Sequence, residues 1–301
     1  MAGTAEKIIL TGLIGRDIAA SRSPWLHERE AEAQGFRLRY DLLDFALLGK
    51  DESFLPVQLQ LAEKMGYAGI NVTYPYKQAI IPHLHVLAPG ATRVGAVNTV
   101  QLARGRRIGY NTDATGFSES LRAGLPNAPL RNVLQLGAGG AGAATAMALL
   151  EMGTTVLFVN DLETYRANEL VQRLCAEFGP NRAVRIDDTA GVLKQVDGLV
   201  NATPLGMASH PESPIDTALL QPRQWVADIV YFPLETTLLR EARKRGCATL
   251  DGSGMVVRQA AAAFEIFTGR APDVARMLQS FLNFPPSMTP TGSHPSGWQQ
   301  A

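Results

Sequence analysis

The sequence predicts an α/β fold of two domains, and three observations lead to this prediction. The chain has 301 residues, more than a single hydrophobic core usually serves. Short apolar runs rich in Val, Ile and Leu alternate with helical patterns along the chain. In mid-chain a glycine-rich turn separates one such run from an alanine-rich helix. A second domain is therefore expected to begin near residue 118.

Strands are expected at six apolar or β-branched runs, which lie at residues 8–14, 69–73, 133–136, 155–160, 198–201 and 225–230. Helices are expected at residues 114–123, 142–150, 255–268 and 272–282. The clearest unit covers residues 133–160, where a strand, a glycine turn, a helix and a second strand follow one another. This βαβ pattern requires a right-handed crossover and is typical of a doubly wound Rossmann-type sheet.

The order of these elements divides the chain into an N-terminal α/β substrate domain and a Rossmann-type dinucleotide-binding domain, with a cleft between them. The substrate domain is expected at residues 1–117 and 256–284, because the last two helices are taken to return to it. The dinucleotide-binding domain is expected at residues 118–255, with a connecting loop near residues 125–130. Residues 285–301 are rich in Pro, Ser and Gly without a period, which predicts a disordered tail.

Composition restricts the class of partner and the compartment. The 28 acidic and 28 basic residues balance and no basic run is present, so a small-molecule partner is expected rather than a nucleic acid. Cys175 and Cys247 stand outside any CxxC or Cys/His cluster, which argues against a structural zinc site or a disulfide framework and fits a reducing cytoplasm. The sequence has neither a signal-peptide pattern nor an apolar run of the roughly 20 residues that span a bilayer, so no membrane anchoring is expected.

The glycine-rich turn has the GxGxxG spacing of a dinucleotide site. It reads GAGGAG, and Gly137, Gly139 and Gly142 hold the three motif positions, with Gly140 and Ala141 between the last two. In such a turn the first glycine allows the tight bend, the second lets a pyrophosphate approach the backbone, and the third allows close packing of helix on strand. A packing turn rich in Ala and Gly is the alternative.

An acid after the second strand of this unit favours NAD over NADP. Asn160 ends that strand, and Asp161 follows about 20 residues after the last motif glycine, where a carboxylate accepts hydrogen bonds from ribose hydroxyls and repels a 2′-phosphate. No Arg or Lys stands at residues 160–165, although Arg166, one turn into the next helix, could still reach the ribose. Asp161 could instead serve as a helix N-cap, and the two roles can coexist.

Four polar clusters in the first half of the chain suit a polyhydroxylated acid as substrate. They read SRSP at 21–24, NVTYPYK at 71–77, GAVNT at 95–99 and GYNTDATGF at 109–117, and each follows a strand or occupies a turn. Each residue also has a structural alternative: Ser23 as a turn or cap residue, Thr73 in a strand, Asn98 in a turn, Lys77 in solvent and Asp113 as an N-cap.

Three further motifs follow in order, which are VNATPLGM at 200–207, DIVYFPLET at 228–236 and DGSGMVVRQAAAAFEIFTG at 251–269. With these motifs and the four clusters, the chain resembles the shikimate dehydrogenase family, and especially its NAD-using quinate/shikimate dehydrogenase branch, over residues 8–284. The resemblance implies NAD-dependent oxidation of shikimate to 3-dehydroshikimate or of quinate to 3-dehydroquinate, by reversible hydride transfer.

The resemblance also implies a set of site residues. Lys77 and Asp113 match the proton-transfer pair of the family. The substrate carboxylate would be bound by Ser21 and Ser23 with Tyr231 beside it, and the ring hydroxyls by Thr73, Lys77, Asn98, Asp113 and Gln259. Thr203, Gly252 and Met255 would lie along the cofactor, with Met255 near the nicotinamide.

The residues leave two rival functions open. One is a dehydrogenase of the same fold for another cyclohexane or cyclohexene carboxylate, such as aminoshikimate, and the other is a non-catalytic NAD-binding sensor. Glu28 stands where many biosynthetic members carry Asn, and Ser23 where some quinate-using relatives carry Thr, so the preferred acid stays open. His27 is expected to pack in the core. Monomer and homodimer are both compatible with the sequence, and Asp161 favours a catabolic direction.

Overall fold

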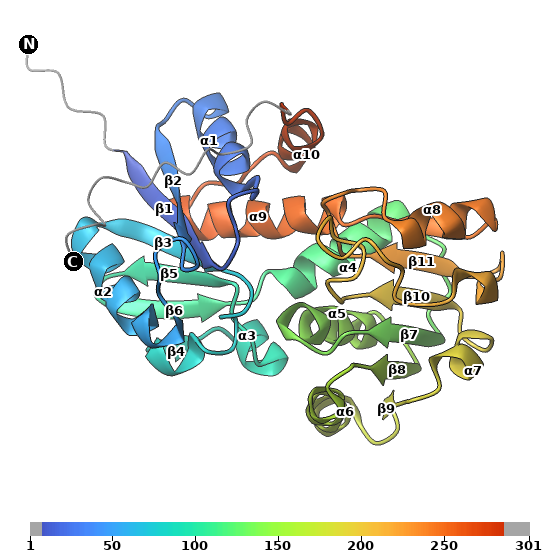
Figure 1. Ribbon diagram of the computed structural model, residues 1–301. Helices are drawn as coiled ribbons and strands as arrows, with labels where there is room; N and C mark the ends of the chain where they lie inside the picture. The colour runs from blue at the N-terminus through green and yellow to red at the C-terminus, as the bar shows by residue number, and fades with distance from the viewer. Residues whose placement is uncertain (1–7, 286–301) are drawn as a thin grey trace, which may run out of the picture. The chain divides into compact units, whose positions relative to one another are not determined.

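The computed structural model describes residues 8–285, which form two compact units (Figure 1). Unit 1 comprises the residues up to 112 and those from 259 on, and unit 2 comprises residues 113–258. Each unit contains a six-stranded sheet with helices packed on it, which confirms the predicted α/β class. The tail predicted at 285–301 lies, apart from Pro285, outside the described residues.

The sheet of unit 1 is mixed and has the strand order β2-β1-β3-β5-β6-β4. Its strands are β1 Ile9–Gly15, β2 Leu38–Asp44, β3 Tyr67–Val72, β4 Val86–Leu87, β5 Thr99–Ala103 and β6 Arg106–Tyr110. β1 runs parallel to β2 and β3, whereas β5 runs antiparallel to β3 and β6. The β5–β6 hairpin turns at Arg104 and Gly105, whose positive φ angles of 51° and 72° suit a two-residue turn between twisted strands.

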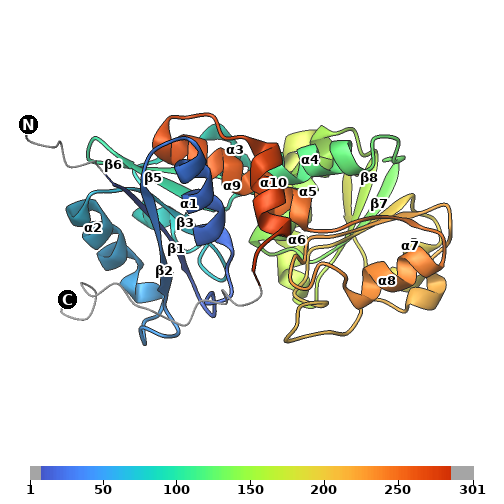
Figure 2. The same cartoon turned by 90° about the horizontal axis from the view of Figure 1, so that it is seen from above.

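Helices cover both faces of this sheet. They are α1 Ser23–Ala33, α2 Leu55–Met65, α3 Pro89–Val94, α10 Val274–Leu282 and, from Gln259 on, part of α9 Ser253–Thr268, with 3-10 turns at Glu52–Phe54 and Ile81–His83. Side chains alternate along β1, so Ile14 belongs to the same apolar cluster as Leu59 of α2, while Leu13 clusters with Ala31 of α1 and Phe264 of α9. Figure 2 shows α1 and α2 on opposite sides of these strands.

A buried acid holds α10 against α1. Glu30 is 1% exposed and accepts two hydrogen bonds from the Arg276 guanidinium, at 2.8 and 2.7 Å. The Asp273 amide and the Gln34 side chain donate to the same carboxylate at 2.9 and 2.7 Å. The Glu30 carboxylate is therefore compensated by four donors, two of which depend on Arg276 in the C-terminal helix.

The sheet of unit 2 is parallel throughout and has the strand order β12-β11-β10-β7-β8-β9. Its strands are β7 Asn132–Leu136, β8 Val156–Asn160, β9 Ala183–Arg185, β10 Gly198–Asn201, β11 Trp225–Asp228 and β12 Ala248–Leu250. The chain winds outward from β7 in one direction and then returns to wind in the other. This is the doubly wound Rossmann-type arrangement predicted from residues 133–160.

The helices of unit 2 are α4 Asp113–Gly124, α5 Gly140–Glu151, α6 Thr164–Phe178, α7 Thr189–Leu193, α8 Thr237–Lys244 and the first part of α9, with a 3-10 turn at Thr217–Leu219. Leu193 of α7 and Leu238 of α8 belong to one apolar cluster with Leu134 and Leu199 of the sheet. Figure 2 shows α7 and α8 on the same side of these strands. None of the helices within residues 8–285 is long and apolar enough to cross a membrane.

Candidate active site

The four polar clusters of the sequence start from one edge of the sheet of unit 1. In the strand register Ile14 is opposite Val72, Asn71 is opposite Thr99, and Thr99 is opposite Tyr110. Because β5 is antiparallel to its neighbours, β1, β3 and β6 all end at the edge where β5 begins. The segments that carry the predicted substrate-binding groups of unit 1 therefore leave the sheet at one place.

Asn98 is fixed at this edge by bonds to both ends of its amide. The side chain is 3% exposed; its Oδ1 accepts from the Thr112 amide at 2.9 Å and from the Thr99 hydroxyl at 3.0 Å, and its Nδ2 donates to the Thr112 hydroxyl at 2.9 Å. The Thr112 hydroxyl in turn donates to the carbonyl of Gln259 at 3.1 Å. Asn98 is thus a buried, oriented amide rather than the turn residue of the structural alternative.

Behind Asn98, two buried side chains that the sequence did not single out support the same segment. Asn71 donates to the Asn98 carbonyl at 3.1 Å and to the Thr99 hydroxyl at 2.9 Å. The Tyr40 hydroxyl donates to Asn71 Oδ1 at 2.8 Å. Asn71 begins the NVTYPYK cluster, so the signal for its role was present, whereas nothing near Tyr40 in the sequence indicated its partner.

Lys77 is half-buried, and its segment is tied to the segment that leads to Asn98. The Val97 amide donates to the Lys77 carbonyl at 2.7 Å. Nearer the strand, the Thr73 amide donates to the Ile14 carbonyl at 2.9 Å, which fixes Thr73 where β3 ends. Lys77 is therefore less exposed than a solvated lysine, and Thr73 lies just outside the strand.

Ser21 and Ser23 lie together at the start of α1. Their hydroxyl oxygens are 3.2 Å apart, and the Ser23 amide donates to Ser21 Oγ at 3.3 Å. Between them, the Arg22 guanidinium donates to the Phe281 carbonyl of α10 at 3.1 Å and is stacked on the Phe281 and Phe284 rings. Ser23 begins α1, and Arg22 rather than Ser23 occupies the N-cap position, so Ser23 is not the cap.

Asp113 is the first residue of α4, is 4% exposed and belongs to unit 2, whereas Lys77 belongs to unit 1. Their action as a proton-transfer pair therefore stays a prediction. Asp113 directly follows Thr112, whose amide donates to Asn98 Oδ1 at 2.9 Å.

In unit 2 the GAGGAG turn has the contacts that its three glycines predict. Gly137 has a φ of +98°, and a Cβ there would lie 2.6 Å from the Ala202 carbonyl oxygen. A Cβ at Gly142 would lie 2.3 Å from the Gly137 oxygen, whereas no atom lies within 4 Å of one at Gly139. Since α5 begins at Gly140, the space above Gly139 faces a helix N-terminus, where a pyrophosphate is favoured.

Gln135, fully buried one residue before the end of β7, braces this turn. Its Nε2 donates to the carbonyls of Gly137 and Gly142 at 2.9 and 2.8 Å, and its Oε1 accepts from the Thr145 hydroxyl at 2.9 Å. A glutamine in an otherwise apolar strand is the sequence signal for this role.

Asp161 follows β8 and links that strand to the glycine turn. Its Oδ2 accepts from the Ala138 amide at 2.6 Å and its Oδ1 from the Glu163 amide at 2.8 Å. The N-cap of α6 is Glu163, so the alternative role of Asp161 as the N-cap is wrong; the carboxylate closes a turn two residues earlier. The Asn160 side chain is also held in place, because its Nδ2 donates to the Ile186 carbonyl at 3.0 Å.

Arg166 is exposed on the first turn of α6, where its guanidinium donates to the Tyr165 hydroxyl at 3.0 Å. This bond raises the pKa of Arg166, so the side chain is a permanent cation close in sequence to Asp161.

Asp228 begins the motif at 228–236, had no role predicted for it, and ends β11 as a buried carboxylate. It is 1% exposed and accepts from Asn201 Nδ2, the Val230 amide and the Thr236 hydroxyl, at 2.9, 3.0 and 2.7 Å. Burial raises its pKa to about 6, and the bonds from Thr236, Val230 and Asn201 oppose this only in part. An acid at the end of an apolar strand was the signal for it.

The remaining predicted site residues of unit 2 follow β10, β11 and β12. Thr203 donates from its hydroxyl to Asn201 Oδ1 at 2.7 Å. A Cβ at Gly252 would lie 2.6 Å from the Ile229 oxygen, so this position requires glycine. Met255 is 8% exposed and Tyr231 is 36% exposed.

His27 packs as expected. It is fully buried, its ring lies 4.6 Å from that of Tyr40, and burial lowers its pKa to about 3, so it is neutral at physiological pH. The adjacent Glu28 accepts from the Tyr40 amide at 2.9 Å, and burial raises its pKa. Both residues thus support β2.

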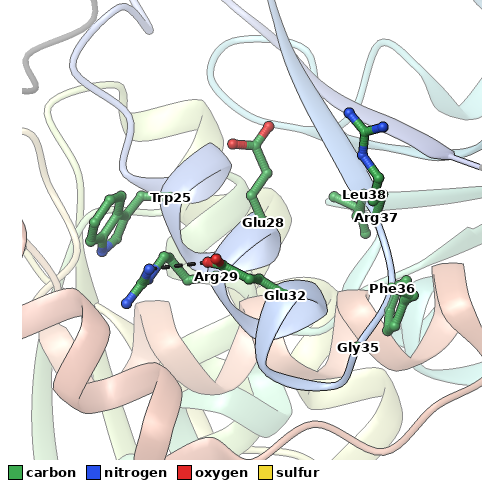
Figure 3. A pocket seen from close by; sticks show the side chains of 8 residues that line it. All are labelled: Trp25, Glu28, Arg29, Glu32, Gly35, Phe36, Arg37 and Leu38. Carbon is green, nitrogen blue, oxygen red and sulfur yellow. Dashed lines mark hydrogen bonds and ion pairs between the residues drawn. The ribbon is translucent and has the colours of Figure 1, made fainter.

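A surface depression of about 580 Å³ lies beside α1 (Figure 3). It is lined by Trp25, Glu28, Arg29, Glu32, Gly35, Phe36, Arg37 and Leu38. Arg29 and Glu32, three residues apart on α1, form an exposed ion pair at 3.0 Å. No predicted site residue lines this depression, so we assign it no part of the candidate site.

Comparisons with known proteins agree with the motifs. The family described as shikimate dehydrogenase substrate binding domain matches residues 13–100, and shikimate 5′-dehydrogenase C-terminal domain matches residues 252–280. The chain is 51% identical to the shikimate dehydrogenase (NADP(+)) of Streptomyces avermitilis over 271 residues, which are 89% of this chain and 93% of the relative. It is 45% identical to the quinate/shikimate dehydrogenase (NAD(+)) of Corynebacterium efficiens over 279 residues, which are 91% of this chain and 98% of the relative.

Solved structures give the same result. The quinate dehydrogenase from Corynebacterium glutamicum in complex with NAD aligns with a TM-score of 0.86 at 44% identity and covers 92% of this chain and 99% of that one. A shikimate dehydrogenase from Thermus thermophilus in complex with NADP(H) and shikimate aligns with a TM-score of 0.79 at 36% identity, covering 91% and 98% of the two chains.

Proposed function

Because the chain belongs to the shikimate dehydrogenase family, we propose that it is an NAD-dependent dehydrogenase that oxidises a ring hydroxyl of shikimate or quinate. The products are 3-dehydroshikimate and 3-dehydroquinate, and the reaction is reversible. The relative named quinate/shikimate dehydrogenase (NAD(+)) and the quinate dehydrogenase solved with NAD support this choice of substrates and cofactor.

One observation supports the substrate class best, which is the common edge of the sheet of unit 1 from which the segments of Ser21, Ser23, Thr73, Lys77 and Asn98 leave. Paired hydroxyls with backbone amides suit a carboxylate, and a fixed amide suits a ring hydroxyl. In this assignment Ser21 and Ser23 bind the carboxylate, and Thr73, Asn98 and Gln259 bind hydroxyls. Tyr231 is assigned to the carboxylate by the family resemblance.

Oxidation of a carbinol removes a hydride and a proton, so the enzyme needs an acceptor for each. NAD, when bound, supplies the hydride acceptor. Lys77 Nζ, as the neutral amine, takes the hydroxyl proton and becomes the ammonium, and the Asp113 carboxylate orients this group and the hydroxyl. These roles rest on the family resemblance and on the chemistry of the two groups.

The cofactor residues of the proposal are those of the turns at the carboxyl ends of the strands of unit 2. The amides around Gly139, Gly140 and Ala141 bind the pyrophosphate, and Asp161 binds the adenosine ribose. Thr203, Gly252 and Met255 line the nicotinamide side. NAD is preferred because the Asp161 carboxylate, already bonded to the Ala138 amide, would repel a 2′-phosphate.

The experiment that tests the function measures initial rates of dinucleotide reduction with shikimate and with quinate, each with NAD and with NADP. We expect turnover with NAD to exceed that with NADP for the better acid. Turnover only with an amino analogue would assign the chain to a related carboxylate. NAD binding without turnover of any of these acids would favour the sensor and contradict the proposal.

Substitution of Asp161 by asparagine is expected to weaken the preference for NAD. The variant keeps an acceptor oxygen for the Ala138 amide but loses the charge that attracts the ribose hydroxyls and repels a phosphate. The ratio of kcat/KM with NAD to kcat/KM with NADP should fall about tenfold or more, which is about 1.4 kcal/mol. Asp216→Ala, which removes an exposed acid elsewhere in unit 2, is the control and should keep the wild-type ratio. An unchanged ratio in Asp161→Asn would remove Asp161 from the selectivity argument.

The family and the composition also suggest where the enzyme works and in what form. We place it in the cytoplasm, in line with Cys175 and Cys247, both of which are free thiols. All of the site residues assigned above belong to one chain, so a monomer and a homodimer both fit the proposal. Size-exclusion chromatography with light scattering distinguishes the two forms.

A further inference from the structure

The buried carboxylate of Asp228 joins three segments of unit 2 that leave the sheet at the carboxyl ends of its strands. Asn201 ends β10, the Val230 amide lies in the segment after β11, and Thr236 is the N-cap of α8. All three donate to Asp228, at 2.9, 3.0 and 2.7 Å. A fully buried carboxylate with this set of partners sets the relative position of the segments.

Asp228 also decides which way the amide of Asn201 points. An ionised carboxylate only accepts hydrogen bonds, so the Nδ2 of the fully buried Asn201 must face Asp228. The same Nδ2 donates to the Leu205 carbonyl at 2.8 Å. This leaves Asn201 Oδ1 for Thr203, whose amide and hydroxyl donate to it at 3.1 and 2.7 Å. The conformation of residues 202–205 is therefore fixed through Asn201.

The segment fixed in this way touches the glycine turn. A Cβ on Gly137 would lie 2.6 Å from the Ala202 oxygen and 3.1 Å from the Thr203 nitrogen, so these backbones are in direct contact. Gly206 closes the same segment beside Asp228, since a Cβ there would lie 3.5 Å from Asp228 Oδ2. A shift of residues 202–206 would therefore displace Gly137, the first glycine of the GAGGAG turn.

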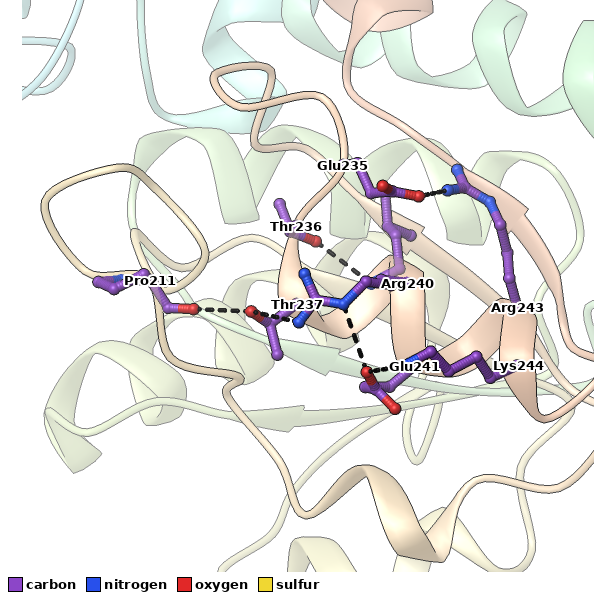
Figure 4. A network of polar contacts seen from close by, with 9 residues as sticks. Pro211, Glu235, Thr236, Thr237, Arg240, Glu241, Arg243 and Lys244 are labelled. Carbon is purple, nitrogen blue, oxygen red and sulfur yellow. Dashed lines mark hydrogen bonds and ion pairs between the residues drawn. The ribbon is translucent and has the colours of Figure 1, made fainter.

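The chain that follows residues 202–206 has a second anchor at α8 (Figure 4). The Thr237 hydroxyl donates to the Pro211 carbonyl at 3.1 Å. At the preceding position, Thr236 Oγ1 accepts from the Leu239 amide at 3.3 Å as the helix cap while it donates to Asp228. Figure 4 shows Thr236 and Thr237 at the start of α8 and the Pro211 carbonyl, on a separate loop, directed toward Thr237. Asp228 therefore supplies the anchor nearer to Thr203.

From these contacts we propose that Asp228 is a positioning residue for the dinucleotide, acting through Asn201 on the Thr203 segment and through the Val230 amide on the segment that carries Tyr231. This positioning role rests on the proposed function, because the Thr203 segment is taken to line the cofactor. Asp228 itself touches neither cofactor nor substrate in this role. Loss of its carboxylate leaves the Asn201 amide held by the Leu205 carbonyl and by Thr203 itself, which loosens the Thr203 segment.

The test is the affinity for reduced dinucleotide, measured by fluorescence titration of the whole protein with NADH and with NADPH. The dinucleotide that the wild type binds more tightly is used for the variants. Asp228→Ala should raise its Kd about tenfold or more. Asp228→Asn should stay within about threefold of wild type, because an amide oxygen can still accept from Asn201 and Val230 and its nitrogen can donate to Thr236.

Asn201→Ala tests the same link from the other side and leaves Asp228 with two of its donors. It should raise the Kd by a similar factor. The Kd of the double variant Asp228→Ala/Asn201→Ala should be no higher than that of the stronger single variant, because both substitutions break the same hydrogen bond between Asn201 and Asp228. The matched control is Asp197→Ala, at the opposite end of β10, where the carboxylate accepts from the Asn132 amide at 2.9 Å. It should lower the Tm without changing the Kd.

A purely structural role for Asp228 would lower the Tm and leave the dinucleotide Kd of the folded protein unchanged, and that result would overturn the proposal. So would additive effects in the double variant, or an equal rise of Kd in Asp197→Ala. Failure of the wild type to bind either dinucleotide would contradict the proposed function as well. Wild-type binding that persists in the Asp228→Ala and Asn201→Ala variants would contradict only the positioning role.

Discussion

Replacement of Lys77 by alanine is expected to lower kcat by about 10²–10⁴-fold, with a much smaller change in KM for the acid. Lys77 is assigned the proton of the reacting hydroxyl, and no other lysine belongs to the four polar clusters. Removal of a group that acts in the transition state lowers kcat. KM should change less, because the serine, threonine and asparagine side chains also bind the substrate. Steady-state kinetics with the better acid, at saturating dinucleotide, measures the effect.

The control is Lys64→Ala, which removes an exposed lysine from the last turn of α2 in the same unit. It should leave both kcat and KM at the wild-type values. Dinucleotide affinity should also be unchanged in Lys77→Ala, because the dinucleotide is assigned to unit 2. Wild-type turnover in Lys77→Ala would remove the residue from the mechanism.

Arg276→Ala is expected to lower the free energy of unfolding by about 3 kcal/mol, the lower part of the range for a broken buried ion pair. Arg276 supplies two of the four bonds to Glu30, which is 1% exposed. Burial alone would raise the pKa of Glu30, but the bonds from Arg276, the Asp273 amide and Gln34 outweigh it and hold that pKa below its usual value. Without Arg276 the carboxylate stays buried with two donors.

Urea denaturation of the purified variant measures this loss. Arg29→Ala is the matched control, because it breaks an exposed ion pair with Glu32 on the same helix α1 and should cost less than about 1 kcal/mol. The double variant Glu30→Gln/Arg276→Ala should recover part of the stability, since no charge is left buried. Equal losses in Arg276→Ala and Arg29→Ala would show that the Glu30 site is not desolvated in solution.

The strands that the sequence predicts most closely are apolar runs in the parallel sheet of unit 2. The run at 198–201 coincides with β10, and the runs at 133–136 and 155–160 differ from β7 and β8 by one residue at one end. β2 was missed because charged and apolar residues mix along it. The β5–β6 hairpin was missed because its turn is Arg104–Gly105, which lacks the Asn-Gly or Asp-Gly signal of a two-residue turn.

The candidate site shows the same limit at the level of single residues. Groups that a local motif carries, such as Gly137, Gly142 and Asn98, could be found from sequence. Their supports could not, because each depends on a partner distant in the chain: Tyr40 is 31 residues from Asn71, and Asn201 is 27 residues from Asp228. Local spacing identifies a functional group, whereas the bonds that orient it appear only when the strand order is known.

The pairing of Glu30 with Arg276 has a consequence for how the protein is made on the ribosome. The two residues are 246 positions apart, so at roughly 5–20 residues per second the emerging chain carries Glu30 for on the order of 10–50 s before its partner is synthesised. Unit 2 is one continuous segment and can close first, whereas unit 1 must wait for the last helix. The unit that contains α1 is therefore expected to mature after unit 2, although α1 is translated before it, and α1 is an element that nascent-chain chaperones would meet unshielded.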